Sequence, residues 1–287
     1  FGRSALHRAA EAGHFDIVKY LVKNDASVNA KHEFGGSALH LAAEAGHLYI
    51  VKYLVENGAV VNSKNEFGKS ALHLAAKAGF FDIVKYLVEN HARVSDDKSK
   101  SILVRVANVL KDVFPFSAMV IPMYEFEGSA LYLAAKAGHL DIVKYLVENG
   151  ANVNSENKFG GSALCHSADA GHLDIVKYLV ENGANVNSEN KFGRSALHFA
   201  VRKGHLDIVK CLVENGASVN SENKSKSLLV RVADALKDSP LMRPRYEVLY
   251  WYPGIATGYN RQFEGSALYL AAEAGHRDII KYLVENS

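Results

Sequence analysis

Cysteine, proline, methionine and tryptophan are all scarce in this chain. Its 287 residues include two cysteines, five prolines, three methionines and one tryptophan. Two cysteines cannot build the disulfide framework of a small secreted scaffold, so that class of protein is excluded. This cysteine usage predicts a reduced, intracellular location, and we expect the cytoplasm.

A strong charge of either sign is also missing. Lysine and arginine number 33 against 31 aspartates and glutamates, which leaves a formal net charge of +2. This balance gives no reason to expect nucleic acid or an anionic membrane surface as a partner. The sequence has no apolar run near the roughly 20 residues of a membrane-spanning helix, and no signal peptide opens the chain.

What the sequence does contain is a repeat of 33 residues. The copy at residues 34–66, FGGSALHLAAEAGHLYIVKYLVENGAVVNSKNE, recurs with few changes from residues 1, 67, 126, 159 and 192, and a shortened copy opens at residue 263. A fixed period of this size predicts a solenoid in which each unit stacks on the next. Because neither end shows a polar capping repeat, which solenoids need for solubility, we expect the chain to be part of a longer array.

Each copy predicts two short helices. Ser37 is a favoured N-cap residue, and Gly46 tolerates the left-handed backbone that ends a helix. A second helix is expected at about residues 48–57, where two adjacent apolar rows recur at spacing i, i+4. Asp25 and His91 replace the glycine that ends the other second helices, which predicts slightly weaker joints there.

The unit resembles the ankyrin repeat. Ser-Ala-Leu-His stands where that family has Thr-Pro-Leu-His, and Ala-Gly-His, Asp-Ile-Val-Lys-Tyr-Leu-Val, Asn-Gly-Ala and Val-Asn follow at the family's spacing. The resemblance implies an all-α solenoid of helix-turn-helix units with β-turn fingers. It also implies a non-catalytic scaffold, with no cofactor, that binds a protein or peptide along its concave face and finger tips. The alternative is a regulatory or targeting segment of a larger enzyme or channel, and we expect a monomer in either case.

Thirteen histidines raise the question of a metal site, because many lie in pairs seven residues apart. The resemblance implies structural roles instead: the motif histidine bonds neighbouring backbone, and the Gly-His pair shapes the turn between the helices. His-Glu-x-x-His and Cys-x-x-Cys patterns are missing, as are Gly-rich phosphate-binding loops. Cys165 and His166 are adjacent, but neighbouring helical side chains point apart. We therefore expect neither enzyme activity nor a metal.

The period fails twice. KSKSILVRVANVLKD at residues 98–112 returns at residues 224–238 with twelve of fifteen positions identical. We interpret each as a decayed first helix, followed by a tail that carries the prolines and the tryptophan. The predicted organisation is regular repeats at 1–97, a degenerate repeat with a short insert at 98–125, regular repeats at 126–224, a degenerate repeat with a longer aromatic insert at 225–262, and a partial repeat at 263–287. If the degenerate units do not stack, the array should split there into separately unfolding blocks.

The partner-binding residues are predicted by carrying the family's contact positions over to this chain. Aromatic rings are expected at the finger tips, at Phe34, Phe67, Phe159 and Phe192. Charged contacts are expected at two places in the repeat. One follows the tip glycine, at Arg3, Lys69 and Arg194. The other lies near the end of the first helix, at Glu11, Glu44, Lys77, Arg202 and Lys203, with Lys136 and Asp169 at the same position in other copies. Each phenylalanine could instead pack on the next finger, and the two roles are compatible.

The longer insert is the remaining candidate. Its aromatic residues, some of them alternating, favour an ordered segment over plain disorder, and the predicted contacts are Tyr246, Tyr250, Trp251 and Tyr252. A loop folded back on the solenoid, a partner-binding loop and a disordered segment all remain open. Replacing Tyr250 and Trp251 with alanine tests the second of these, because it should weaken partner binding without unfolding the regular repeats.

Overall fold

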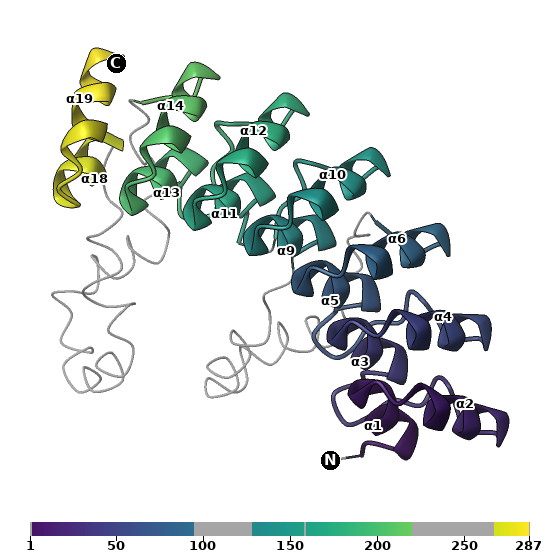
Figure 1. Cartoon of the computed structure of the whole chain (residues 1–287). Helices are drawn as coiled ribbons and strands as arrows, with labels where there is room; N and C mark the ends of the chain where they lie inside the picture. Colours follow the sequence, from purple (N-terminus) through teal and green to yellow (C-terminus); the bar gives the residue numbers. More distant parts are fainter. Residues whose placement is uncertain (1, 95–127, 158, 220–266, 287) are drawn as a thin grey trace, which may run out of the picture. The chain divides into compact units, whose positions relative to one another are not determined.

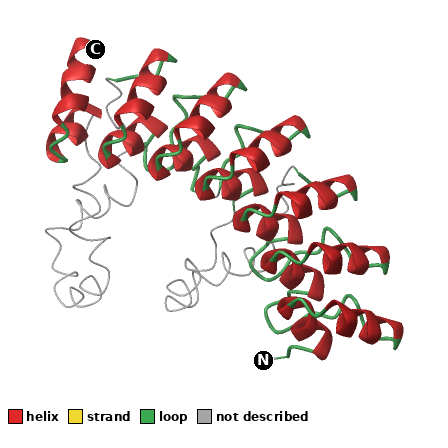
Figure 2. Cartoon of the chain, in the orientation of Figure 1, coloured by secondary structure: helices red, strands yellow, loops and turns green. Residues whose placement is uncertain are grey.

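A computed structural model describes residues 2–94, 128–157, 159–219 and 267–286 of the chain. The regular elements within these ranges are α-helices, arranged in consecutive pairs (Figure 2). The chain divides into two compact units, Phe1–Lys158 and Phe159–Ser287. The degenerate repeats expected at 98–125 and 225–262 lie outside the described residues.

Four helix pairs make up the first unit. In chain order they are α1 (Ala5–Ala12) and α2 (Phe15–Lys23), α3 (Ala38–Ala45) and α4 (Leu48–Glu56), α5 (Ala71–Ala78) and α6 (Phe81–Glu89), and α9 (Ala130–Ala137) and α10 (Leu140–Glu148). The second unit has three pairs, which are α11 (Ala163–Ala170) and α12 (Leu173–Glu181), α13 (Ala196–Lys203) and α14 (Leu206–Glu214), and α18 (Ala267–Glu273) and α19 (Arg277–Glu285).

A serine and a histidine fix the start of the first helices α1, α3, α5 and α13. The Ser37 N–H donates to Nδ1 of His40 over 3.1 Å, and the His40 Nε2–H donates to the main-chain oxygen of Ser63 over 3.0 Å. His7 makes the same bond to the oxygen of Ala30, also over 3.0 Å. The motif histidine therefore joins the first helix to the finger that follows the second helix, and the predicted backbone bonds of His7 and His40 are confirmed.

The helix ends also follow the sequence prediction. Gly46 ends α3 with φ of 86°, and Gly58 follows α4 with φ of 85°. Asp25 and His91 adopt the same left-handed backbone, with φ of 63° and 67°. Since side chains with a Cβ are disfavoured there, the expected strain falls at these two residues.

The core of each unit lies between successive helix pairs. Leu39, Ala42 and Ala43 of α3 are fully buried, and so are Val51 and Leu54 of α4. Small alanine side chains let the first helices approach closely, so each first helix packs extensively on the next, whereas the second helices touch more sparsely. In the first unit α1, α3, α5 and α9 therefore form one layer, and α2, α4, α6 and α10 form the other (Figure 1).

An asparagine also bonds the end of α4, of α6 and of α14 to the repeat before it. The Asn29 Nδ2–H donates to the Gly58 main-chain oxygen over 2.8 Å, and its Oδ1 accepts from the Val60 N–H over 2.9 Å. Asn62 and Asn187 make the same double contact with the repeats that follow them. These bonds satisfy main-chain groups that a helix end leaves without a helical partner.

The repeats on either side of residues 95–127 are in direct contact. Helix α5 packs on α9, and α6 touches α10, in the same way as neighbouring repeats elsewhere in the first unit. In the second unit α13 packs on α18 and α14 touches α19, across residues 220–266. Each stack is therefore continuous where the sequence period fails.

Candidate partner-binding surface

Neighbouring fingers are joined by their backbone and by their tip rings. The Glu66 N–H donates to the Phe34 oxygen over 3.0 Å, and the Phe34 and Phe67 rings stack with centroids 6.2 Å apart and an interplanar angle of 27°. In the second unit the Lys191 N–H donates to the Phe159 oxygen over 2.8 Å, and the Phe159 and Phe192 rings stack at 6.3 Å.

These stacked rings nevertheless face solvent. Phe34 is 47% exposed and Phe192 is 46% exposed, while Phe67 and Phe159 are half-buried. Each ring therefore packs on its neighbour, as one of the two predicted roles requires, and keeps one part accessible. Contact with a partner stays a prediction. Stacked aromatic rings held by a bonded backbone offer rigid apolar area, which costs little entropy when a partner binds.

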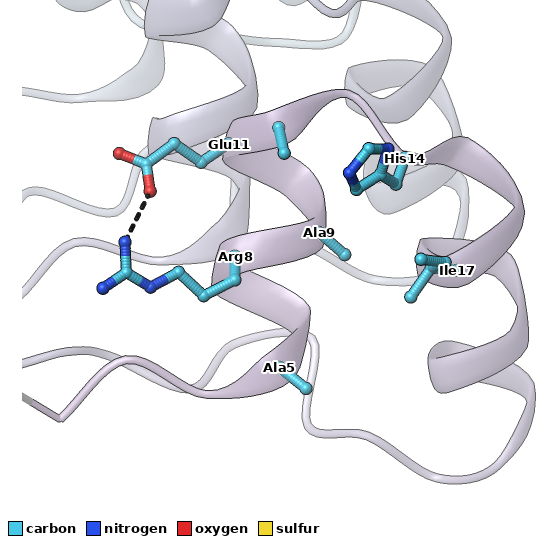
Figure 3. A pocket seen from close by; sticks show the side chains of 7 residues that line it. Ala5, Arg8, Ala9, Glu11, His14 and Ile17 are labelled. Atoms are coloured by element: carbon cyan, nitrogen blue, oxygen red, sulfur yellow. Dashed lines mark ion pairs between the residues drawn. The ribbon is translucent and has the colours of Figure 1, made fainter.

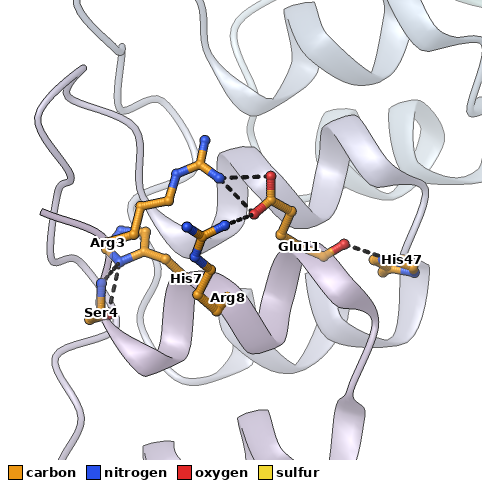
Figure 4. Close-up of polar contacts among 6 residues, drawn as sticks. All are labelled: Arg3, Ser4, His7, Arg8, Glu11 and His47. Carbon is orange, nitrogen blue, oxygen red and sulfur yellow. Dashed lines mark hydrogen bonds and ion pairs between the residues drawn. The ribbon is translucent and has the colours of Figure 1, made fainter. Parts of the chain in front are cut away.

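The first repeat shows how the finger residues relate to the first helix. Arg3 follows the finger tip, and its Nη1 lies 2.8 Å and 2.7 Å from the two carboxylate oxygens of Glu11 in the last turn of α1 (Figure 4). Arg8 approaches the same carboxylate at 3.5 Å. Two of the predicted groups of charged residues thus lie on the same side of a repeat, within reach of one another.

In the second unit the corresponding charges also meet. The Arg202 Nη2 lies 2.8 Å from the Asp169 Oδ1, which joins the ends of α13 and α11 in successive repeats. The Arg202 guanidinium also lies over the Phe199 ring at 5.6 Å, and the Arg194 guanidinium lies over the Phe192 ring at 5.6 Å. Lys203 beside them is exposed. Such cation–π contacts hold the guanidinium planes against the surface.

The remaining predicted charges surround Lys69 in the first unit. Lys69 is half-buried, whereas Glu44, Lys77 and Lys136 are exposed. Burial lowers the pKa of the Lys69 ammonium, and the positive charges of Lys77 and Lys136 add to this effect, while Glu44 opposes it. The field of each of these groups therefore reaches Lys69, although they come from three different repeats.

The second set of histidines makes contacts between repeats. The His47 Nε2 lies 3.1 Å from the Glu11 main-chain oxygen in the preceding repeat (Figure 4), and His205 reaches the Asp169 oxygen in the same way at 3.4 Å. The family resemblance implied a role in the inter-helix turn, and His47 does precede α4. The structure adds a bond by which His47 and His205 each tie their repeat to the one before it.

An open hollow lies on the outer face of α1 and α2. It is lined by Ala5, Arg8, Ala9, Glu11, Ala12, His14 and Ile17 (Figure 3). Ile17 is 50% exposed, whereas Ile50 at the same position of the next repeat is 1% exposed because the first repeat covers it. The hollow therefore lies on the face that packs against a neighbouring repeat in the later copies, and three of its seven lining residues are alanines.

Metal-ligating side chains do not cluster in the described ranges. Within them, no three His, Cys, Asp or Glu side chains lie close enough to hold a metal ion. Cys165 and Cys211 are both buried, and burial raises the pKa of the Cys211 thiol. His166 faces the Phe199 ring, with centroids 6.2 Å apart. In the same ranges no helix is long and apolar enough to span a membrane.

The structure brings most of the predicted contact residues together on one side of the repeats. Tyr246, Tyr250, Trp251 and Tyr252 lie outside the described residues, so their role stays a prediction. Arg8 and Phe199 were not predicted, although both occupy a position where α3, α5 and α9 have leucine, and this departure was the signal that could have identified them.

A stack of consecutive helix pairs defines a helical repeat solenoid. Residues 6–98 and 131–223 match a family model described as ankyrin repeats in three copies, and since these ranges cover more than half of the chain, the chain belongs to the ankyrin-repeat family. It is similar to the crystal structure of the human ASB11 ankyrin repeat domain, with 27% sequence identity and a TM-score of 0.64 over 83% of this chain and 99% of that one. None of the curated proteins compared with the chain matches it. Repeats of this family generally mediate protein–protein interactions and are typically non-catalytic.

Proposed function

We propose that the chain is a non-catalytic scaffold that binds a protein or peptide with the finger tips and first helices of its repeats. One observation carries the proposal: charged and aromatic side chains are accessible on a backbone that is already fixed. The finger backbones are bonded to one another, and buried histidines tie them to the first helices. A surface that is ordered before binding pays little conformational entropy on association.

A comparison of the first helices in successive repeats also supports a partner-binding surface. The buried positions of the first helix are nearly the same in α1, α3, α5 and α9, whereas the exposed position near its end changes between glutamate and lysine. Packing needs only the buried face to repeat, so the changing face is free to match a partner. Charge variation along such a row supplies specificity and register more than raw affinity.

Site-specific photo-crosslinking tests this proposal. We expect a benzophenone side chain in place of Phe34 or Phe192 to crosslink the partner, because both rings are exposed at finger tips. The matched control is the same side chain at Tyr20, which is 67% exposed on the second helix of its repeat. Crosslinking at Tyr20 but not at the two finger positions would place the partner on the second-helix side and contradict the proposal.

A further inference from the structure

A side chain two residues before the tip phenylalanine holds the finger tip in place. In two fingers this side chain is asparagine. The Asn65 Oδ1 accepts from the Phe67 N–H and from the Lys69 N–H, over 3.0 Å in each case. Asn190 holds its own finger in the same way and accepts from the Phe192 N–H over 2.9 Å. An amide side chain does not titrate, so these bonds do not depend on pH.

The finger that precedes α3 uses a histidine for the same purpose. The His32 Nδ1 accepts from the Phe34 N–H over 3.1 Å. A Cβ on Gly36 would lie 2.5 Å from the His32 Nε2, so a side chain at residue 36 would displace the ring. Lys69 and Arg194 stand at this position in the two asparagine fingers. The larger imidazole is thus matched by the loss of a neighbouring side chain.

The His32 ring connects the exposed tip to the first repeat. It meets the Phe34 ring edge-on, with centroids 5.9 Å apart, and it meets the His7 ring in the same manner at 5.6 Å. His7 is buried in α1, and its Nε2 lies 3.0 Å from the Ala30 main-chain oxygen. A change at His32 therefore acts directly on Phe34, one of the rings that the proposed partner would contact.

The bond to Phe34 requires a neutral histidine. The Nδ1 of an imidazole accepts a hydrogen bond only while it carries no proton, whereas both ring nitrogens of the charged form are donors. Protonation of His32 would therefore set an Nδ1–H against the Phe34 N–H and remove the bond. Histidine changes its charge in the range of pH just below neutrality, where an asparagine finger stays unaltered.

The surroundings of His32 favour its neutral form. Burial lowers the pKa of the His32 imidazole, and the nearby charges of His7 and Arg3 lower it further. The carboxylates of Glu33 and Glu11 oppose this effect without reversing it. The folded finger therefore takes up a proton less readily than an unfolded chain, in which histidine titrates at about pH 6.5. As the pH falls below this value, protonation increasingly favours an open finger.

We propose that His32 is a positioning residue that makes the Phe34 finger tip sensitive to pH. Protonation of its ring removes the acceptor of the Phe34 N–H, loosens the tip and separates the Phe34 ring from the Phe67 ring. A partner then binds this tip more weakly in mild acid, while the tip at Phe192 stays in place. This inference rests on the proposed scaffold function and adds a condition under which one part of the binding surface is lost.

Fluorine-19 nuclear magnetic resonance of the full chain, with 4-fluorophenylalanine in place of Phe34, tests the inference without a partner. Between pH 7.5 and pH 5 we expect the resonance of residue 34 to move toward its position in the unfolded chain, with a midpoint below pH 6.5. The same label in place of Phe192 should not move. His40 is coupled to the His32 charge, but its own pKa of about 4 keeps it mainly neutral over this range.

His32→Asn is the matched variant, because it gives this finger the side chain of the other two. We expect it to abolish the pH dependence at residue 34 and to leave the helical circular-dichroism signal unchanged. Movement at residue 34 that persists in His32→Asn would assign the titration to another group, such as His7, and overturn the inference. A resonance that stays still in the unsubstituted finger, or one that moves equally at residue 192, would also overturn it.

The consequence for binding is measured with benzophenone crosslinking at residues 34 and 192. From pH 7.5 to pH 5 the yield at residue 34 relative to that at residue 192 should fall about threefold, the effect of having to order one side chain on binding. His32→Asn should keep this ratio constant. A constant ratio in the unsubstituted finger would overturn the inference. Crosslinking at neither residue would reject the scaffold proposal instead, and the fluorine titration would still decide the role of His32.

Discussion

The His139 Nε2 lies 3.3 Å from the Lys77 main-chain oxygen, although the two residues are 62 positions apart in the chain. His47 makes the same contact with Glu11 over 36 positions, and His276 makes it with Arg202 over 74 positions. The bond therefore marks repeats that are adjacent in a stack, whatever length of chain connects them. Residues 95–127 and 220–266 leave this register unchanged.

Close approach of the histidine ring requires a glycine in the preceding repeat. A Cβ on Gly79 would lie 2.5 Å from the His139 ring, whereas a Cβ on Gly58 would meet nothing within 4 Å. The two glycines have nearly equal φ, 86° and 85°. Gly58→Ala therefore measures backbone strain alone, and we expect it to lower the free energy of unfolding by about 1 kcal/mol. Gly79→Ala should lower it by at least about 1 kcal/mol more, because the added Cβ pushes α5 and α10 apart. Urea unfolding of both variants checks this, and equal losses would contradict a tight Gly79–His139 contact.

Direct packing of α5 on α9 predicts that residues 100–125 can be removed. Their deletion restores the 33-residue spacing between the copies that open at residues 67 and 126, and it breaks no contact between the helices on either side. We expect the helical circular-dichroism signal to be kept and the first unit to melt in one transition. A split into two transitions would show that the α5–α9 interface needs the deleted residues.

Much of this fold was predictable because its signals are local. The copy at residues 34–66 predicted its helices from an N-cap serine, two apolar rows and two glycines, and the structure places them at Ala38–Ala45 and Leu48–Glu56. Asp25 and His91 replace the helix-ending glycine, and their positive φ shows that they adopt its left-handed backbone. The weaker joints predicted there stay a prediction. In these cases the residue that causes the feature lies within a turn or two of it.

The parts that could not be predicted depend on which repeats touch. Once the period fails, the sequence does not say whether the copy at residue 126 stacks on the copy at residue 67. Lys77 and Lys136 were each predicted as contact residues, but their shared environment follows from the α5–α9 interface. The bond from His47 to Glu11 was likewise missed, because it joins residues of different repeats.

A matched pair of isoleucines measures what stacking contributes. Ile17 and Ile50 occupy the same position in α2 and α4, but they are 50% and 1% exposed. We expect Ile50→Ala to cost about 2–4 kcal/mol of unfolding free energy, because it opens a cavity between two repeats. Ile17→Ala should cost less than about 1 kcal/mol, since solvent can fill the space it leaves. Denaturant titrations at one temperature check both values, and similar losses would mean that a further surface covers Ile17.

The two strained helix ends offer a stabilising change. Asp25 and His91 have φ of 63° and 67° where most copies have glycine. We expect Asp25→Gly and His91→Gly each to raise the free energy of unfolding by about 0.5–1 kcal/mol, because glycine adopts this backbone without a Cβ clash. The reverse change, Gly150→Asp, starts from φ of 88° and open space, so it should lower stability by a similar amount. Unchanged or lower melting temperatures for both glycine variants would show that these side chains compensate for the strain.

Two buried histidines predict how stability depends on pH. Burial lowers the pKa of His40 from 6.5 to about 4, and burial with the nearby Arg194 charge lowers the pKa of His198 to about 4. Between pH 6.5 and pH 4 the unfolded chain therefore binds more protons than the folded chain at these sites. The free energy of unfolding should fall as the pH falls through this window, by on the order of 3 kcal/mol for each histidine.

The His40→Gln variant isolates one of these contributions. Its amide can donate to the Ser63 oxygen and accept from the Ser37 N–H as His40 does, but it does not titrate. We expect unfolding free energies measured from pH 7 to pH 4 to fall less steeply in the variant, by the slope of about one proton. From pH 7 to pH 8.5, where His40 is neutral in both states, the two slopes should agree. Parallel curves across the acidic window would mean that His40 takes up its proton equally well in the folded and the unfolded chain, in conflict with its buried bond to Ser63.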